Sequence, residues 1–536
     1  KKSSSKKSKS WQISKANWNA LRDYYGSFPW VDSCFVSDIS ISASNITQVI
    51  LDGMSFSVFF ITTSGHPSSP KWFNSKCSAA VDSKNHLFHK YKSDPTTFNF
   101  DAYRKARNFC RDTISSAKKN FINNVAHQLI SCPLGSKSFW SLANRIAKDF
   151  CGSSFSPMLE NDVSILSDPV DKANLFASLF AHKSSVDDSG KSPPLFSQPS
   201  QIMKSFQFST RKVRHLLKHL DVNKAVGPDG IPPCVLKFCA PELAPVLCKL
   251  FNLSLSSGIC PTDWKKADVF PVPKKGDRSN PLNYRPISIT SVLCKVMESL
   301  INDKILCFLE ADNINFFSDH QYGFRKRRST GDLLSYISHS WSSVIDKGGL
   351  AAVISLDISK AFDRVWHPCL INKLHHAGIN PSIIAWINSY LFNRSLSVRI
   401  DNIHSKEFRF NAGVPQGCVL APTLFLIYIN DLLSITDSQI HSYADDSTPH
   451  TTALPGRNNV INYVPAASSL LTTDLSKIIQ WGKANLVEFN TSKTHQLLIS
   501  HRHDTDDFPS IFMGDDNVKN ETSPFMLGVT LDSKLS

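Results

Sequence analysis

AAVISLDISKAFDRV, residues 351–365, is the stretch that decides the fold class. Its first half alternates as a β-strand does. Alternate side chains of a strand face opposite sides, so Ala352, Ile354 and Leu356 face away from Asp357. The apolar face can pack beneath helices, whereas Asp357 stands at the carboxyl end of the strand. Open α/β sheets bind their ligands at that end, so the stretch predicts an α/β enzyme with Asp357 in its site.

A helix is expected to follow this strand. It begins just after Asp357, runs through Leu370 and Leu374 and ends at Gly378, because glycine readily takes the left-handed conformation that closes a helix. From Phe208 to the end of the chain, helical and strand-like segments alternate between turn signals. This alternation agrees with an α/β architecture.

SYADDST, residues 442–448, is the second acidic motif. Adjacent residues of a regular strand face opposite sides, so Asp445 and Asp446 could not both line one site there. They could do so at a hairpin turn, which aspartate favours and which the surrounding polar residues suit. The alternative is an ordinary solvated turn. Because Asp357 precedes the motif in its own strand-to-helix setting, the pair is interpreted as part of a site.

The three aspartates together suggest a metal site. Adjacent carboxylates repel one another, and a bound cation is the usual compensation. The carboxylates of Asp357, Asp445 and Asp446 form an all-oxygen ligand set that suits Mg²⁺. Two such ions could activate an attacking oxygen and stabilise a leaving oxygen in a phosphoryl displacement. The sequence therefore predicts two Mg²⁺ ions, with Mn²⁺ as the alternative metal.

The composition points to a polyanionic partner. The 536 residues include 59 Lys and Arg against 45 Asp and Glu, a net charge of +14, and basic side chains bind nucleic acid by displacing its counterions. A basic protein without such a partner is the alternative. The 13 cysteines are scattered without a CxxC pair, which predicts reduced intracellular thiols. No apolar run reaches roughly 18–20 residues, so no membrane span is expected.

The motif blocks resemble those of the reverse transcriptases, in the same order, from about residue 221 to 532. LDISKAFDRV resembles the first catalytic block and YADD the second. Between them, NAGVPQGCVLAPTLFLIYINDL (411–432) resembles the block that seats the nascent base pair. Upstream, VGPDGIP, FPVPKKGD, NYRPISIT and QYGFRKRRST resemble blocks of the non-LTR (LINE-type, jockey-like) retrotransposon branch. The resemblance implies a right-hand polymerase with fingers and an α+β palm, preceded by a mainly helical basic N-terminal region.

The residues of the middle block suit that role. Gly413, Pro415 and Gly417 allow a backbone to approach a flat ligand closely. By resemblance, Gln416 contacts the incoming nucleotide or its template base; the alternative is an amide that caps the loop. Pro422 suits the first turn of the helix that follows. That helix is expected to carry an apolar core stripe of Leu424, Phe425, Tyr428, Ile429 and Leu432.

The resemblance assigns further residues to the incoming nucleotide. Phe362 is the steric gate, whose ring occupies the place of a ribose 2′-hydroxyl and so favours deoxynucleotides; the alternative is a helix core residue. Ile358, beside the first aspartate, also contacts the nucleotide. Arg285, with Lys274 or Lys275, binds the triphosphate, because cations offset its developing charge. For the two lysines, an exposed basic turn is the alternative.

Other charged residues are assigned to the template and the product. A run of four cations resembles a segment that tracks template phosphates, although such a run is usually a solvated face: Arg325, Lys326, Arg327 and Arg328. Lys493, in FNTSKT, resembles a later palm block and could act in catalysis by protonating pyrophosphate. Asp363 and His367 are expected to be structural.

The chain is expected to divide into five regions. Residues 1–70 are a disordered basic start and connecting segment, with disorder expected over the Lys/Ser-rich residues 1–10 and mixed helix and strand character from Trp11 to about Thr63. Residues 71–181 are a helical basic extension. Residues 182–205, rich in Ser and Pro, are a linker. Residues 206–350 are the fingers with the upstream blocks, and 351–536 are the palm, which ends at the primer-grip block.

The resemblance implies an RNA-directed DNA polymerase that copies retrotransposon RNA, primed at a DNA nick. Its partners would be an RNA template, a DNA primer or target and deoxynucleoside triphosphates, in a ribonucleoprotein of the nucleus and cytoplasm. The chain has no initiating Met. We expect a piece of a longer protein, lacking the endonuclease, most of the thumb and the C-terminal segment. The alternatives are a group II intron-type maturase and a non-catalytic nucleic-acid-binding remnant, which would have no reason to keep all three aspartates.

Overall fold

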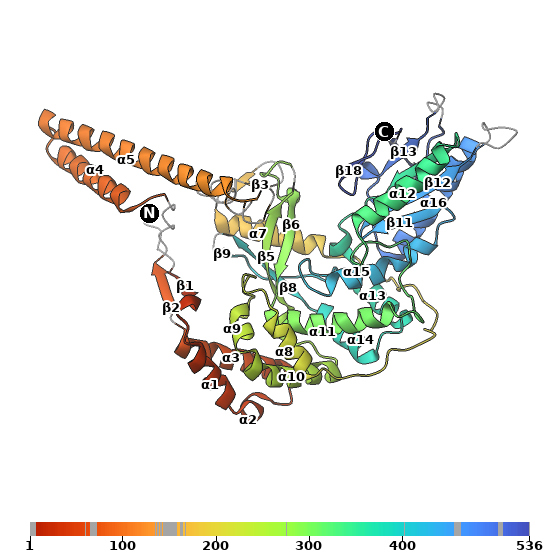
Figure 1. Ribbon diagram of the computed structural model, residues 1–536, viewed down its shortest axis with the longest axis horizontal. Coiled ribbons are helices and arrows are strands. Elements are labelled where there is room, and N and C mark those ends of the chain that lie inside the picture. Colours follow the sequence, from red (N-terminus) through yellow and green to blue (C-terminus); the bar gives the residue numbers. More distant parts are fainter. Residues whose placement is uncertain are drawn as a thin grey trace. The chain divides into compact units, whose positions relative to one another are not determined.

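The computed structural model describes residues 7–58, 60–64, 72–133, 136, 139, 142, 158–160, 164–166, 168–274, 276–400, 403–454, 463–501 and 508–534. Its ribbon is drawn in Figure 1. The chain forms two compact units, one of residues 1–16 and 58–157 and the other of residues 17–57 and 158–536. The mixture of helices and sheets agrees with the expected α/β fold.

The first unit contains a strand pair and a long helical hairpin. β1 (Lys7–Trp11) pairs antiparallel with β2 (Phe60–Ser64). Strand structure therefore begins inside the stretch that was expected to be disordered. α4 (Ser75–Ser93) and α5 (Thr97–Ile130) pack against each other as an antiparallel hairpin, as Figure 1 shows.

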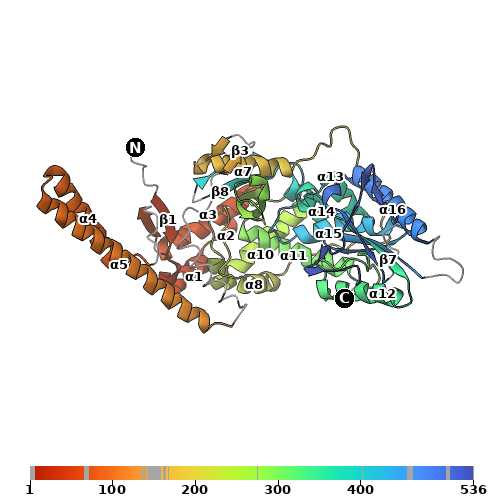
Figure 2. The ribbon, with the colours of Figure 1, turned by 90° about the horizontal axis from the view of Figure 1, so that it is seen from above.

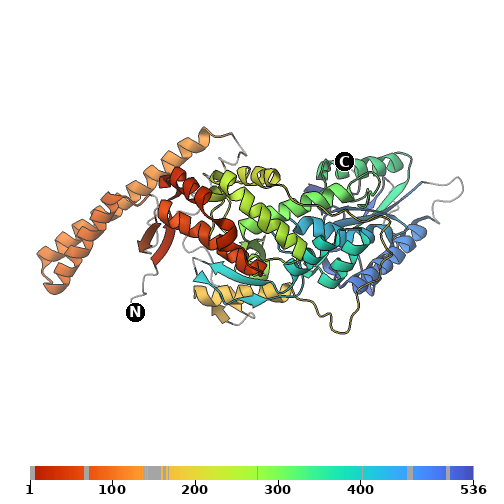
Figure 3. The ribbon, with the colours of Figure 1, turned by 90° about the horizontal axis from the view of Figure 1, so that it is seen from below.

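Three helices near the N-terminus belong to the second unit: α1 (Trp18–Ser27), α2 (Trp30–Cys34) and α3 (Ile39–Ser57). α1 and α3 pack on α10 (Ala240–Ser257), which Figure 3 shows beside them. Their inward faces are fully buried at Leu21, Ile46, Ile50 and Met54. Helices here agree with the mixed helix and strand character expected from Trp11 to about Thr63.

The first sheet joins strands from two distant parts of the sequence. β5 (Lys266–Pro273) pairs antiparallel with β6 (Tyr284–Ile289) and parallel with β8 (Ser395–Ile400). β9 (Ile403–His404) and β10 (Phe408–Arg409) both pair with β8. The segment from β8 to β10 was assigned to the palm, but it completes the sheet of the expected fingers. Among the neighbouring helices, α8 (Thr210–Lys218) packs on α9 (Pro233–Phe238), on α10 and on α11 (Val292–Leu309).

The second sheet carries the two acidic motifs. Its strand order is β11–β12–β7–β13–β16. The bounds are Leu350–Ser355 for β7, Gln439–Tyr443 for β11, Asp446–Ala453 for β12, His495–Ile499 for β13 and Lys519–Asn520 for β16. β7 lies at the centre, antiparallel to β12 and β13.

A helix covers one face of this sheet. Leu333, Ile337 and Trp341 of α12 (Thr330–Ile345) pack in one buried cluster with Ala351 and Val353 of β7. Burial of an aliphatic side chain of this size stabilises the fold by about 1.5–3 kcal/mol. Val353 and Ser355 lie on the same face as Asp357, so α12 packs on the face of β7 that leads to Asp357. The residues of β7 are buried on both faces, except for the half-buried Ser355 at its end.

The remaining helices surround the second sheet or connect it to the first: α13 (His367–His376), α14 (Pro381–Leu391), α15 (Ala421–Ile429) and α16 (Tyr463–Asn485). The apolar stripe expected for α15 and the turn after it is buried throughout, and Pro422 lies in its first turn, so both predictions are confirmed. Short hairpins pair β3 (Met158–Glu160) with β4 (Ser164–Leu166), β14 (Phe512–Met513) with β15 (Asp516–Asn517), and β17 (Phe525–Met526) with β18 (Val529–Thr530). No helix in the described ranges has both the length and the apolar character that a bilayer span requires.

The expected linker has no helix or strand after Lys183, yet it is held to the fold. α7 (Pro169–Lys183) packs on β8 in the second unit, so the chain divides after residue 157 rather than after 181. Beyond α7, Asp188 accepts a 3.0 Å hydrogen bond from the Trp366 indole, and the carbonyl of Ser197 lies 2.8 Å from a His376 ring nitrogen. Figure 2 shows this segment leaving α7 as a loop that passes α13.

Candidate active site

The two acidic motifs meet at one end of the strands of the second sheet. Tyr443 pairs with Asp446, which leaves Ala444 and Asp445 as the two residues of the turn between β11 and β12. Ala444 has a φ of +62°, a value that tight hairpin turns require. Asp357 follows β7, where Leu356 bridges to Ser447 at the start of β12. The predicted hairpin turn is therefore confirmed, and the strand end that carries Asp357 lies beside it.

The charges of the three carboxylates influence one another. The pKa of Asp446 is raised to about 6, first by burial and then by the charges of Asp445 and Asp357. Burial also raises the pKa of Asp445, with a further contribution from Asp357 that Arg285 opposes. This mutual repulsion is what a bound cation would relieve. Across the described residues, no three acidic, His or Cys side chains are already arranged around one point as metal ligands; the donor set nonetheless fits a hard cation such as Mg²⁺.

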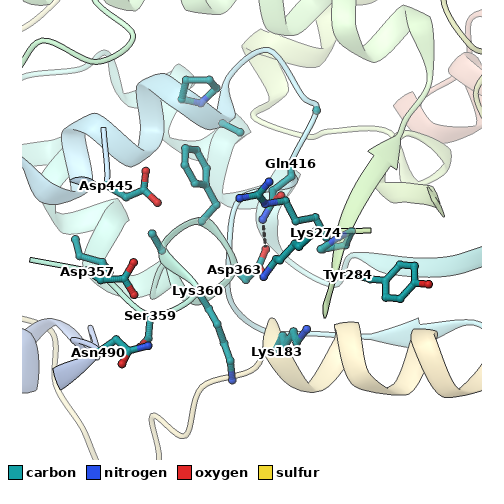
Figure 4. Close-up of a pocket in the computed structure, with 18 of the residues that line it drawn as sticks. Lys183, Lys274, Tyr284, Asp357, Ser359, Lys360, Asp363, Gln416, Asp445 and Asn490 are labelled. Atoms are coloured by element: carbon teal, nitrogen blue, oxygen red, sulfur yellow. Dashed lines mark hydrogen bonds between the residues drawn. The ribbon is translucent and has the colours of Figure 1, made fainter. Parts of the chain in front are cut away.

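A pocket of about 800 Å³ opens beside this end of the sheet and brings together most of the predicted site residues. Figure 4 shows Asp357 and Asp445 on one side of it and Gln416 and Lys274 on another. The predicted residues that line it are Lys274, Arg285, Asp357, Ile358, Phe362, Gln416, Asp445 and Lys493. Asp446 is not among the lining residues, and Lys275 lies outside the described residues.

Comparison with known proteins agrees with this arrangement. Residues 272–531 match the family described as "Reverse transcriptase (RNA-dependent DNA polymerase)". This region is a reverse transcriptase domain. It contains both acidic motifs and most of the pocket wall, and the family resemblance expected from the motif blocks is confirmed.

Relatives of this reverse transcriptase domain come from mobile elements of Drosophila melanogaster. The RNA-directed DNA polymerase from the mobile element jockey is 29% identical over 334 residues, 61% of this chain and 35% of the relative. The probable RNA-directed DNA polymerase from transposon BS is 30% identical over 287 residues, 52% of this chain and 30% of the relative. That from transposon X-element is 28% identical over 335 residues, 61% of this chain and 36% of the relative. The chain thus spans about a third of the length of these relatives.

Phe362 of the reverse transcriptase domain lies in the pocket wall, but the helix expected there does not start where predicted. Ala361–Arg364 form a 3₁₀ turn, Lys360 before it has a φ of +52°, and α13 begins only at His367. The Phe362 ring stacks on the buried ring of Phe425, with centroids 4.5 Å apart. Its other environment is the pocket, so Phe362 is a partly exposed wall residue rather than an ordinary core residue.

The loop that carries Gln416 is shaped by close contacts with protein backbone. Gly413 and Gly417 have φ values of +87° and +105°. A Cβ on Gly413 would lie 2.5 Å from the carbonyl oxygen of Asp363, and one on Gly417 would lie 2.9 Å from that of Ser288. The close approach of these glycines to a flat ligand stays a prediction; the approaches seen in the structure are to the backbone of this chain. Both positions require glycine for conformation and for space.

Five cations of the second unit reach the pocket. Arg285 lies on β6, Lys274 follows β5, and Lys493 places its Nζ 3.8 Å from Asp357 Oδ2. Two more were not predicted: Lys360 in the turn before Phe362, and Lys183 at the end of α7. Burial and then Lys274 lower the pKa of Lys183 to about 8, while Asp363 opposes this shift. Lys183 precedes the matched domain by many residues, and only the tertiary fold brings it to the pocket.

Two residues expected to be structural differ in their surroundings. Buried His367 donates its Nε2–H to the carbonyl oxygen of Gly413 at 2.8 Å, and burial lowers its pKa to about 4, which agrees with a structural role. Asp363, in contrast, lines the pocket and accepts a 2.8 Å hydrogen bond from Gln416 Nε2. The structural role expected for Asp363 therefore leaves out its place in the pocket wall.

The basic run 325–328 divides into bound and exposed residues. Arg325 donates to the carbonyl oxygen of Ser318 at 2.8 Å, and Arg328 pairs with the carboxylate of Asp319 at 2.7 Å. These guanidinium groups hold their own loop together, so the template role predicted for Arg325 and Arg328 lacks support in the structure. Lys326 and Arg327 are exposed.

The segment before this run forms hydrogen bonds to the β11–β12 hairpin, whose turn carries Asp445. Gln321 Oε1 accepts hydrogen bonds from the backbone nitrogens of Gly323 (3.0 Å) and Ala444 (3.1 Å). The backbone of Tyr322 donates to Ser442 of β11 at 2.8 Å. Because Ala444 is the turn residue directly before Asp445, these bonds fix the turn from outside the sheet. No local pattern predicts this contact, because it joins segments more than a hundred residues apart.

Three histidines form a hydrogen-bonded chain behind the same hairpin. The Trp341 indole donates to His450 Nδ1 (3.2 Å), His450 Nε2 lies 3.1 Å from His441 Nδ1, and His441 Nε2 lies 3.0 Å from His320 Nδ1. Trp341 can only donate, so His450 must carry its proton on Nε2. The same logic then places a proton on Nε2 of His441. His450 and His441 are therefore neutral, and the hydrogen bonds run in one direction, from Trp341 towards His320.

This chain predicts a pH-dependent stability. Burial lowers the pKa of His450 to about 4, and burial with its two neighbours lowers that of His441 to about 3. In the unfolded chain these histidines have a pKa near 6.5 and bind protons at pH values where the folded rings stay neutral. Their contribution to the free energy of unfolding is therefore fully present above about pH 7 and is lost as the pH falls. We expect His450 and His441 each to remove about 2 kcal/mol of unfolding free energy between pH 7 and pH 5.

Urea unfolding of wild type and His450→Gln at pH 7 and pH 5 measures this loss. The raised pKa of Asp446 acts in the opposite direction in both proteins, so the comparison between them is decisive. The variant should lose less stability than wild type between the two pH values, by about 2 kcal/mol. Equal losses in both proteins would contradict the neutral histidine chain.

Proposed function

We propose that this chain is an RNA-directed DNA polymerase that copies retrotransposon RNA into DNA. The observation that carries the proposal is the meeting of Asp357 with the Asp445–Asp446 turn at a pocket inside a reverse transcriptase domain. The relatives are named as RNA-directed DNA polymerases of mobile elements. The chain spans about a third of their length, so template choice and priming at a DNA nick are part of the proposal.

The chemistry follows from the residues around the pocket. Asp357, Asp445 and Asp446 are the groups that would hold two Mg²⁺ ions, with Mn²⁺ as the alternative metal. When bound, such ions lower the pKa of an attacking hydroxyl and stabilise the charge of the leaving pyrophosphate. These carboxylates repel each other in the protein alone, and this fits a site that is completed by cations.

Side chains on the other walls bind and orient the nucleotide. Arg285 and Lys274, with Lys183, place positive charge where the triphosphate would lie. Phe362 offers a ring edge to the sugar, and Gln416 offers an amide to the base or sugar. Lys493, beside Asp357, is placed to donate a proton to the leaving pyrophosphate. Exposed Lys326 and Arg327 are the members of the basic run that remain available to template phosphates.

Primer extension tests this function. With poly(rA) as template and oligo(dT) as primer, we expect incorporation of dTTP that depends on Mg²⁺ or Mn²⁺. The assay should be run with this chain and with a version extended at its C-terminus, because a longer thumb would hold the duplex more firmly. Binding of the duplex by both versions without any extension would instead favour a non-catalytic nucleic-acid-binding protein. A preference for structured intron RNA over poly(rA) would favour a maturase.

A further inference from the structure

Asp363 is an acidic side chain in a pocket whose proposed ligand is strongly anionic. It lies in the 3₁₀ turn Ala361–Arg364, next to Phe362, and it is partly buried. Figure 4 shows its carboxylate facing Gln416, on the far side of the pocket from Asp445. A carboxylate at this place would repel a triphosphate, so its presence calls for another role.

The hydrogen bond between Asp363 and Gln416 fixes the direction of the Gln416 amide. Gln416 Nε2 donates to Asp363 Oδ1 at 2.8 Å. An ionised carboxylate can only accept, so the amide nitrogen must face Asp363, and the opposite orientation of the amide would place two acceptors together. The amide oxygen is then the polar atom of Gln416 that remains for a ligand.

The backbones that carry the two side chains are also joined. The nitrogen of Val414 donates to the carbonyl oxygen of Phe362 at 2.8 Å, and the nitrogen of Ser288 donates to that of Gln416 at 2.8 Å. Gly413 passes so close to the Asp363 carbonyl oxygen that any larger residue would collide with it. The pair is therefore held on two rigid segments, which restricts the amide to one place as well as one direction.

Cations from three separate segments act on Asp363 and favour its ionised form. Burial raises the pKa of Asp363, and the hydrogen bond from Gln416 followed by the charges of Lys183, Lys274 and Lys360 opposes that rise. All three lysines line the same pocket. An ionised Asp363 can orient Gln416 and at the same time is neutralised by its neighbours, so that it adds little repulsion towards a triphosphate.

We propose that Asp363 is a positioning residue, which fixes Gln416 with its amide oxygen towards the incoming nucleotide, where it accepts a hydrogen bond from a hydroxyl or amino group of that nucleotide. The inference rests on the proposed polymerase function and deepens it, because it makes the amide oxygen of Gln416 a hydrogen-bond acceptor for the nucleotide. Asp363 itself does not touch the nucleotide, and it acts only through Gln416.

A double-mutant cycle tests this dependence. Asp363→Ala, Gln416→Ala and the double variant are compared with wild type in kcat/KM for dTTP on poly(rA)/oligo(dT). Each single change should lower kcat/KM about 10- to 100-fold, the usual effect of a lost hydrogen bond to a charged group. The fall in kcat/KM should come mainly from an increase in KM for dTTP, and the affinity for the duplex should be unchanged. If Asp363 acts through Gln416, the double variant should be no worse than Gln416→Ala alone.

Two further proteins separate positioning from mere loss of structure. Asp363→Asn keeps the shape but accepts less strongly and no longer enforces one amide direction, so an intermediate KM is expected. Asp23→Ala removes an exposed carboxylate from α1 and should match wild type. Multiplied losses in the double variant, or a wild-type KM in Asp363→Ala, would overturn the proposal.

Equilibrium binding distinguishes failure of this inference from failure of the proposed function. Binding of dTTP to the protein–duplex complex is measured with Ca²⁺ in place of Mg²⁺, so that affinity is obtained without turnover. If wild type binds dTTP but extends no primer, the polymerase function is wrong, and the same cycle in binding constants still decides whether Asp363 and Gln416 are coupled. If wild type neither binds nor incorporates dTTP, both proposals fail.

Discussion

Asp445→Asn is expected to lower deoxynucleotide incorporation by at least about 10²- to 10³-fold, because loss of one charged group at the reacting centre removes several kcal/mol of transition-state stabilisation. Asp445 occupies the turn between β11 and β12 and lines the pocket, whereas the supporting bonds from Gln321 go to the backbone of Ala444. Asparagine has nearly the same shape and tolerates tight turns. The change should therefore remove the negative charge and leave the hairpin in place.

Duplex binding by Asp445→Asn should stay close to wild type, because phosphate contacts by Lys and Arg supply most of the affinity for nucleic acid. A matched control is Asp437→Asn, which lies before β11 and pairs on the surface with Lys477 at 2.6 Å. Such exposed ion pairs contribute little to stability, so this variant should extend primers normally. Near-normal incorporation by Asp445→Asn in the same assay would refute its place in the chemistry.

Local sequence patterns predicted the parts of the site that depend on neighbouring residues. The alternation in AAVISLDIS marked β7, and the Asp-Asp pair in a polar setting marked the turn between β11 and β12. Both features follow from side-chain direction and turn chemistry within a few residues. The predicted start of the helix after Asp357 was wrong, and the cause is also local. Lys360 adopts a left-handed conformation and Ala361–Arg364 form a 3₁₀ turn, so the first helical residue is delayed to His367.

Contacts between distant segments could not be predicted in the same way. Lys183 reaches the pocket because α7 packs on β8, and β8 itself pairs with β5 across a long stretch of sequence. The hydrogen bond between Asp363 and Gln416 likewise joins two motifs, residues 351–365 and 411–432, that lie far apart in the sequence. The cations of 325–328 looked alike in sequence, but only the fold shows that Arg325 and Arg328 are bound to carbonyl and carboxylate groups of their own loop.

Phe362→Ala is expected to raise ribonucleotide incorporation relative to deoxynucleotide incorporation by about 10- to 100-fold or more. The ring stacks on Phe425 with centroids 4.5 Å apart and lies perpendicular to the ring of Phe324 with centroids 6.0 Å apart, so neighbouring aromatic rings hold it in one place at the pocket wall. A ring held in this way excludes a 2′-hydroxyl by steric clash and by desolvation, and that exclusion can be worth several kcal/mol. Alanine removes the obstacle without adding charge.

The ratio of UTP to dTTP incorporation on poly(rA)/oligo(dT) measures this change, taken where circular dichroism shows the variant to be folded. If Phe362 served only as packing, its truncation would cost up to about 3–5 kcal/mol of stability and leave the ratio unchanged. Phe324→Leu provides the matched comparison, because it removes one neighbouring ring and leaves Phe362 stacked on Phe425. A loosened ring should raise the ratio by less than complete removal does. An unchanged ratio in Phe362→Ala, whatever its stability, would remove the steric-gate assignment and leave the reverse transcriptase domain intact, because the domain rests on the match over residues 272–531 and on the three aspartates.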